Sequence, residues 1–236
     1  MKLFALAAGL AAGLPIVCLS ATAQADENRV VIELFTSQGC SSCPPADELL
    51  ERLAERDDVL PLALHVDYWD YIGWADSFAR PEHTRRQKAY ARIAGSRSIY
   101  TPQMIIGGVE QIVGTRPMEV ADAVMRHVQQ GPAIDLDVER DGDTLRIMSD
   151  TPATARGPLL VQLVRYMPHQ VVEIGRGENA GRTLTYTNIV TEWSILAEWT
   201  GAEPLDLSAE VPGPDAVAVI VQKAGNGRIL AAADLR

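Results

Sequence analysis

Cysteine is scarce in this chain of 236 residues, which has only Cys18, Cys40 and Cys43. Histidine is nearly as rare, with four residues scattered along the sequence. There is no second C-x-x-C pair and no H-x-x-x-H spacing, although a tetrahedral zinc site normally takes four ligands from two such clusters. We therefore expect no metal site in this protein.

Positive charge is also in short supply. The chain has 21 lysines and arginines against 31 acidic residues, so its formal net charge is −10. This balance gives no electrostatic reason to expect a nucleic acid or an anionic membrane as a partner. With 47% hydrophobic and 22% charged residues, the composition is that of a globular protein with a sizeable core.

Long hydrophobic runs are confined to the N-terminus. Lys2 precedes an apolar stretch, and Ala23-Gln24-Ala25 has the form of an A-x-A cleavage site. We interpret residues 1–25 as a signal peptide, so the protein is expected to be exported, periplasmic or secreted, with no stable membrane span after cleavage. An uncleaved anchor is a weaker alternative, because Gly9, Gly13 and Pro15 interrupt the stretch. A lipoprotein site at Cys18 is another, because Pro15 and Val17 suit such a site poorly.

Cleavage leaves Cys40 and Cys43 as a C-x-x-C pair in an exported chain. A bridge between them would stabilise the fold little, because the loop it closes is so short. The pair is therefore predicted to be redox-active, and a structural disulfide or a thiolate ligand pair for copper(I) remain the alternatives. No cofactor beyond a redox-active Cys40–Cys43 disulfide is expected.

Apolar runs and helix signals in residues 26–131 alternate in the way typical of an α/β domain. The expected elements are strand Val30–Phe35, a helix from Pro44 to about Asp58, strand Val59–Val66, helix Pro81–Arg92, strands Gln103–Ile106 and Gln111–Val113, and helix Met118–Gln130. For the last helix we expect a cap at Thr115 and a core stripe of Ala121, Val124, Met125 and Val128.

After Gly131-Pro132 the apolar period changes to two, which is typical of β-structure. Strands are expected within 134–138, 145–147, 159–166, 171–174, 182–193, 205–210, 216–222 and 228–232. We therefore predict an α/β domain (residues 26–131) followed by an all-β sandwich-like domain (residues 132–236).

A strand leading into C-x-x-C at a helix start favours thiol chemistry, since free backbone N–H groups and the helix dipole stabilise the first cysteine as a thiolate. Cys40 is the candidate nucleophile, and Cys43 is placed to resolve a mixed disulfide. This order of elements, with Thr101-Pro102 further on, resembles the thioredoxin superfamily over residues 30–130. The resemblance implies that the α/β domain of residues 26–131 is thioredoxin-like. The resemblance implies that Pro102 is cis, that it faces the cysteines, and that Thr101 pairs its backbone with a substrate peptide.

Four longer segments resemble one family in particular, the secreted thioredoxin-like family known as domain of unknown function 1223. The segments are LFTSQGCSSCPPAD (34–47), HVDYWDYIGW (65–74), YTPQMIIGG (100–108) and GRGENAGRTL (175–184). The likeness covers nearly the whole mature chain and implies a fold but no settled reaction.

Two positions depart from the thioredoxin pattern. Leu34 occupies the site of the usual buried acid, and Gly39 replaces the tryptophan before the first cysteine. Asp67 and Glu33 are the candidate proton acceptors, although Glu33 is expected on the opposite face of its strand from Leu34.

Two loops are less clear. Trp69 and Trp74 are candidate substrate-binding residues that could line a peptide groove, or they pack a long loop against the sheet. Glu178-Asn179 is interpreted as part of a tight turn, with a cover over Cys40 as the alternative.

The sequence thus predicts an exported thiol–disulfide oxidoreductase that acts on protein or peptide thiols and disulfides, with a redox partner protein. The alternative is a non-enzymatic thiol-dependent binding or copper-handling module.

Overall fold

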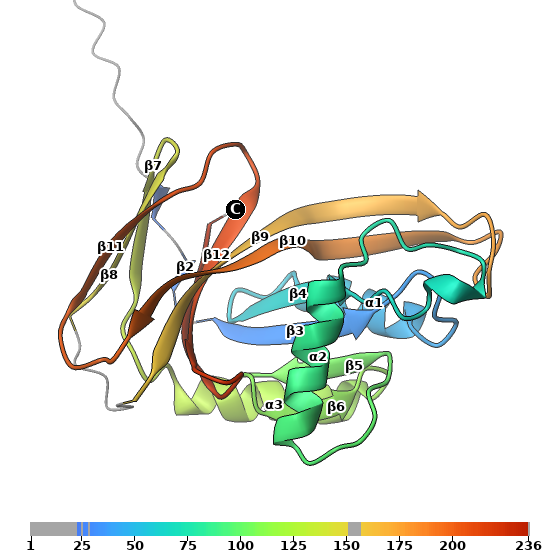
Figure 1. The fold of residues 1–236 in the computed structure, drawn as a ribbon, viewed down its shortest axis with the longest axis horizontal. Helices are drawn as coiled ribbons and strands as arrows, with labels where there is room; N and C mark the ends of the chain where they lie inside the picture. The colour runs from blue at the N-terminus through green and yellow to red at the C-terminus, as the bar shows by residue number, and fades with distance from the viewer. Residues whose placement is uncertain (1–22, 25, 28, 151–156, 236) are drawn as a thin grey trace, which may run out of the picture.

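The computed structural model describes residues 23–24, 26–27, 29–150 and 157–235 (Figure 1). Residues 1–22 of the predicted signal peptide, Cys18 among them, lie outside these ranges. Within the described residues, no helix is long and apolar enough to cross a membrane.

The helices that the structure describes are α1 (Pro44–Leu53), the 3-10 helix η1 (Asp70–Ile72), α2 (Pro81–Ile93) and α3 (Pro117–Gln130). The first strands are β1 (Ala23–Gln24), β2 (Asp26–Glu27), β3 (Val30–Thr36), β4 (Val59–His65), β5 (Gln103–Ile106) and β6 (Glu110–Val113). The later ones are β7 (Asp137–Asp141), β8 (Thr144–Ser149), β9 (Leu159–Glu173), β10 (Thr183–Trp199), β11 (Leu205–Glu210), β12 (Ala216–Lys223) and β13 (Ile229–Leu235).

The predicted fold class, an α/β thioredoxin-like domain followed by a separate β-sandwich-like domain, is wrong. One mixed sheet of nine described strands contains strands from both sides of Gly131, in the order β2-β13-β12-β9-β10-β4-β3-β5-β6. A second described sheet has four strands, in the order β1-β7-β8-β11. The two parts of the chain therefore share a sheet.

The junction is the parallel pairing of β10 with β4, which brings Ile189 opposite Ala63. Asn188 supports it, because its buried side-chain amide donates a hydrogen bond of 2.8 Å to the carbonyl of Pro61. This asparagine has a φ of 49°, a left-handed conformation that asparagine tolerates better than most residues. A local break in strand geometry thus lets β10 join the first part of the chain.

Strands β9 and β10 are 15 and 17 residues long, and β9 spans both of the separate strands expected within 159–166 and 171–174. Because polar residues and Pro168 interrupt the apolar pattern of β9, the sequence analysis divided this strand in two. In the structure the two strands pair along their length as a hairpin that extends far beyond β12 (Figure 1).

The helices cover both faces of the first part of the large sheet. Alternate residues of β3 face opposite sides, as a strand requires. Ile32 and Leu34 pack in one core with α1 and α3, whereas Val31 and Phe35 pack in another with Tyr90 of α2. Of the expected core stripe of α3 only Val124 is buried, since Ala121 is half-buried and Met125 and Val128 are exposed. The other buried residues of this helix are Val120, Ala123 and His127. The expected cap at Thr115 is wrong. The residue at the cap is Arg116, one position after Thr115.

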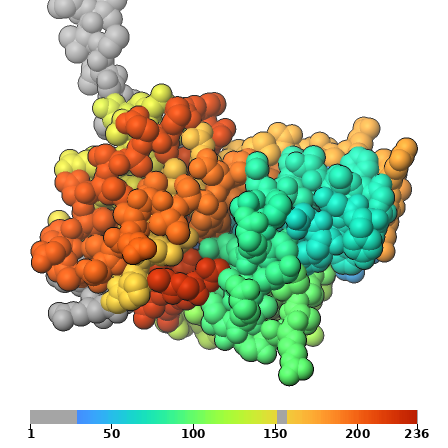
Figure 2. Space-filling view, in the orientation of Figure 1, coloured from blue at the N-terminus to red at the C-terminus, as the bar shows by residue number. Residues whose placement is uncertain are grey.

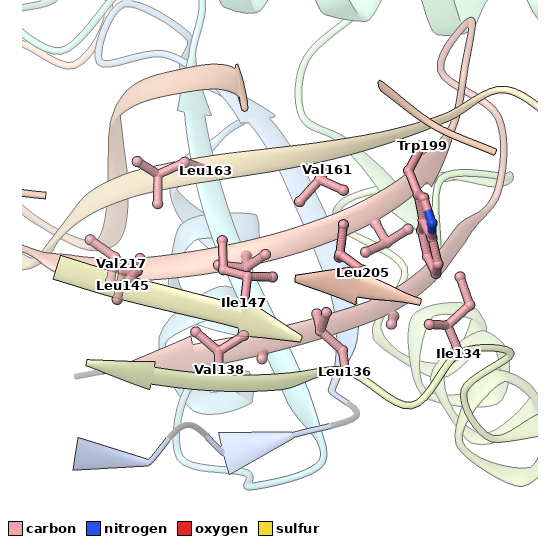
Figure 3. Close-up of a cluster of buried hydrophobic side chains, with 14 of the residues drawn as sticks. Ile134, Leu136, Val138, Leu145, Ile147, Val161, Leu163, Trp199, Leu205 and Val217 are labelled. Atoms are coloured by element: carbon pink, nitrogen blue, oxygen red, sulfur yellow. The ribbon is translucent and has the colours of Figure 1, made fainter. Parts of the chain in front are cut away.

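A third core lies between the four-stranded sheet and the C-terminal part of the large sheet (Figure 3). Ile147 of β8 and Leu205 of β11 meet Val161 of β9 and Val217 of β12 there. The period-two pattern after residue 132 arises from this packing, because one face of each strand is turned toward the other sheet.

A buried ion pair links α2 to three strands. The Arg86 guanidinium donates to Glu33 of β3 at 2.5 and 3.0 Å and to Gln222 of β12 at 3.1 Å. It also lies 3.8 Å from the ring centroid of Trp193 on β10. The Glu33 side chain is fully buried, so these contacts and the hydrogen bond from the Tyr90 hydroxyl are needed to stabilise its negative charge.

We predict that Glu33→Gln destabilises the protein by about 3 kcal/mol, because it leaves a buried arginine without its counter-ion. Urea unfolding of the purified variant would measure the loss. Glu82→Gln is the matched control, since Glu82 pairs with Arg85 on the surface, where solvent and salt screen the interaction. Equal small effects for the two variants would contradict the prediction.

Candidate functional site

Cys40 and Cys43 lie in the turn between β3 and α1 and form a disulfide, with a Cα–Cα distance of 5.4 Å. Both are buried, with 2% of Cys40 and none of Cys43 exposed. Between them Ser41 and Ser42 are exposed. The strand–C-x-x-C–helix arrangement predicted from the sequence is confirmed, and Cys40, the candidate nucleophile, is buried in the disulfide form.

Hydrogen bonds hold the turn before Cys40. The Ser37 hydroxyl accepts from the Gly39 amide at 3.1 Å, and the Ser37 carbonyl accepts from the Cys40 amide at 3.1 Å. The Gln38 amide donates to Asp76 at 2.8 Å. A Cβ at Gly39 would lie 3.2 Å from Cβ of Trp69, so glycine suits this close approach.

The start of α1 offers fewer N–H groups than the sequence analysis assumed. Pro44 and Pro45 fill its first positions and carry no N–H. The amides of Ala46 and Asp47 both donate to the carbonyl of Cys43. These four residues of the first turn therefore leave no amide free for a thiolate at Cys40.

The aromatic loop after β4 lies beside this turn. Trp69 donates its indole N–H to the Thr101 hydroxyl at 2.7 Å, and Trp74 donates to the Gln38 side chain at 2.7 Å. The Thr101–Pro102 bond is cis, as the resemblance implied. Trp69 thus contacts Gly39 and Thr101, and Trp74 contacts Gln38, so both tryptophans border the turn before Cys40.

The loop joining β9 to β10, residues 174–182, reaches the same turn from the other part of the chain. The side-chain amide of Asn179 donates to the carbonyls of Gln38 and Cys40 at 2.9 and 3.0 Å. Gly175 and Gly177 lie against Trp74. Figures 1 and 2 show the tip of this hairpin beside the loop between β4 and α2.

Glu178 and Asn179 are functional candidates that the sequence analysis took for a tight turn. The signal for them was GRGENAGRTL among the segments that resemble the family. Spacing alone could not place these residues, because about 140 positions separate them from Cys40. The alternative interpretation, a cover over Cys40, is the one that the contacts support.

A buried polar cluster lies at the ends of β3 and β4 beside the first turn of α1, and the sequence analysis missed it. His65 at the end of β4 bonds through Nδ1 to Asp76 at 2.7 Å. Other buried polar atoms have no hydrogen-bond partner among the described residues: both carboxylate oxygens of Asp47, His65 Nε2, Thr36 Oγ1 and Tyr186 Oη.

Asp47 is the titratable group of this cluster nearest in sequence to the cysteines. Burial raises the pKa of its carboxyl from an ordinary 3.8 to about 7, and the neighbouring His65 and Thr36 offset this only in part. A cavity of about 200 Å³ between α1 and the start of β10 is lined by Asp47, Glu48 and Arg182, among others. Asp47 therefore titrates near neutral pH beside a hollow in the surface.

The two acids named from the sequence lie elsewhere. Glu33 is held by Arg86 and Tyr90 on the face of β3 opposite Leu34. Asp67 accepts a hydrogen bond of 2.5 Å from the Thr84 hydroxyl. Their roles as proton acceptors stay predictions. In the described part of the chain, no three His, Cys, Asp or Glu side chains lie close enough together to hold a metal ion.

Two solved structures resemble this one. A crystal structure of a protein from Agrobacterium tumefaciens is 30% identical, with a TM-score of 0.75, and the match covers 87% of this chain and 93% of that one. HBP35 of Porphyromonas gingivalis is 15% identical, with a TM-score of 0.58 and coverage of 89% and 75%, which is a likeness of fold alone.

No curated protein matches the chain. The model of a family described as a protein of unknown function, DUF1223, matches residues 31–222. This range includes the disulfide, the aromatic loop and the β9–β10 hairpin. The chain therefore belongs to the DUF1223 family.

Proposed function

We propose that this protein is a thiol–disulfide oxidoreductase that acts on protein or peptide disulfides through Cys40 and Cys43. The observation that carries the proposal is the disulfide between these two residues at the strand-to-helix turn. A disulfide that closes a loop of only two intervening residues stabilises a fold little. Stabilisation alone is therefore a poor explanation for this bond.

In the proposed reaction the reduced protein attacks a substrate disulfide with the Cys40 thiolate. The substrate S–S bond breaks, a mixed disulfide forms at Cys40, and one substrate sulfur leaves as a thiolate that takes up a proton. The Cys43 thiolate then attacks Cys40 Sγ, which restores the Cys40–Cys43 disulfide and releases the second substrate thiol. Two electrons pass to the substrate, and a thiol donor returns them in the next cycle.

The Cys43 thiol must lose its proton before it can attack, because the thiolate is the nucleophile. We assign the proton acceptor to Asp47, which follows Cys43 by one helical turn. Cys43 has helical φ and ψ values of −79° and −35°, so the two side chains leave the same side of the helix. A pKa of about 7 suits a group that gains and loses a proton near neutral pH.

Substrate positioning falls to Thr101, Pro102, Trp69 and Trp74 in this proposal. Trp69 bonds to Thr101 and contacts Gly39, and Trp74 contacts Gln38 and the hairpin loop, so the two tryptophans border the turn that leads into the disulfide. Tyr71 in the same loop is 81% exposed and adds apolar surface for a peptide. A partner would then meet both the aromatic loop and the tip of the hairpin.

Export to an oxidising compartment completes the proposal. It rests on the form of residues 1–25 and on the presence of only two cysteines after them. In such a compartment the proposed partners are exported proteins or peptides with thiols or disulfides, together with a redox partner protein that exchanges electrons with Cys40.

The mature Cys43→Ala variant is expected to accumulate a mixed disulfide at Cys40 when its reduced form meets a peptide disulfide. The resolving thiol is then missing, so the intermediate cannot break down within the protein. Mass spectrometry of the intact protein would detect the added peptide. Wild-type protein should carry none at the end of the reaction.

Cys40→Ala is the matched control and should carry little adduct, because Cys43 is completely buried. The absence of an adduct on Cys43→Ala, together with unchanged peptide disulfide, would contradict the proposed function.

Asp47→Asn is expected to stabilise the oxidised protein at neutral and alkaline pH but not at acidic pH. The folded-state pKa of about 7 lies above the ordinary 3.8, so the stability of the wild type falls as pH rises through this window. Below about pH 4 the carboxyl is protonated in both states. The free energy of unfolding of the variant, relative to that of wild type, should therefore rise by about 2–4 kcal/mol from pH 4 to pH 8.

Urea unfolding of the oxidised proteins at pH 4 and pH 8 would measure this gain. Asp57→Asn is the control, since Asp57 is exposed just after the same helix. A constant difference between wild type and Asp47→Asn at both pH values would show that Asp47 has no raised pKa, and would remove it as the proton acceptor.

A further inference from the structure

The hairpin loop, residues 174–182, is hydrogen-bonded to the turn that carries the disulfide. Asn179 is 1% exposed and donates to two carbonyls of the turn, those of Gln38 and Cys40. Its own side-chain oxygen accepts from Arg182 at 3.0 Å, which fixes the orientation of the amide. The loop is thereby held at a defined position against Cys40.

Glu178, which precedes Asn179, contacts Ser41, the residue after Cys40. One of its carboxylate oxygens accepts a hydrogen bond of 2.6 Å from the Ser41 hydroxyl. The same oxygen lies 3.4 Å from the Ser41 backbone amide, which also donates to it. A negative charge from β9–β10 is thus placed one residue from Cys40.

The Ser41 amide matters because the turn has few donors. The two prolines of α1 carry no N–H, and the next two amides are used by the Cys43 carbonyl. An amide at this place would otherwise help to stabilise a Cys40 thiolate. Glu178 occupies that amide and adds repulsion, so both effects disfavour the thiolate.

We infer that Glu178 is a positioning residue that lowers the reduction potential of the Cys40–Cys43 couple. The lower potential favours electron donation from the reduced protein to substrate disulfides. The inference rests on the proposed function and adds the residue that favours its direction, Glu178, through its contacts with Ser41. The physical link is general: a dithiol whose thiolate is stabilised is a strong oxidant in its disulfide form, and loss of that stabilisation lowers the reduction potential.

Other charged and titratable groups surround the turn from neighbouring elements. They are Asp47 on α1, the His65–Asp76 pair after β4, and Arg182 at the end of the hairpin loop. Substitution of Glu178 leaves all of them in place. A change in the couple can then be assigned to the carboxylate that contacts Ser41.

The test is the equilibrium of the mature protein with reduced and oxidised glutathione, for wild type and Glu178→Gln. Glutamine keeps the size of the side chain and removes the charge. We expect the constant for reduction of the disulfide to rise threefold to tenfold, which at 29.6 mV per decade is a potential higher by about 15–30 mV. The pKa of Cys40, followed by the ultraviolet absorbance of its thiolate, should fall in the variant.

Glu173→Gln is the matched control, because it removes the same charge at the end of β9, an exposed position in the same hairpin. It should leave the potential unchanged. A Glu178→Gln protein with wild-type potential, or with a lower one, would overturn the inference while the proposed exchange reaction stands. A wild-type disulfide that glutathione cannot reduce at any ratio would overturn both.

Discussion

The parallel pairing of β10 with β4 is the constraint on which the rest of the structure depends. It joins the two parts of the chain into one sheet, and the side chain of Asn188 completes it by bonding to the β4 backbone at Pro61. Because β9 and β10 are long, the hairpin continues past this junction, and Asn179 in its loop bonds to the carbonyl of Cys40. The hairpin therefore serves both the core and the candidate site.

The environment of the cysteines follows from that geometry. Trp69 lies against the turn from one side, and Asn179 and Glu178 reach it from the hairpin. Two prolines at the start of α1 remove the amides that usually favour a thiolate there. A buried, raised-pKa carboxyl at Asp47 and a negative charge at Glu178 make the site more acidic in composition than a C-x-x-C motif alone suggests.

Local structure was predictable wherever the residue pattern and the burial agree. Strand β5 was predicted with its exact bounds, and β3, β4 and α2 to within one residue, because each has an apolar run or a proline at its boundary. Helix α3 was placed correctly, but its buried face was not: Val120 and His127 turn inward, and Met125 and Val128 turn outward. The sequence alone does not show which side of a short amphipathic helix meets the sheet.

The sequence by itself determined the strand–C-x-x-C–helix turn, the cis position at Thr101-Pro102 through its family resemblance, and the alternation that makes the second part β-rich. Only the tertiary structure decided which strands pair and which distant residues meet Cys40. The physical reason is that strand register and pairing depend on packing between segments far apart in the chain. Glu178 carries no local signal of the contact with Ser41 that folding creates.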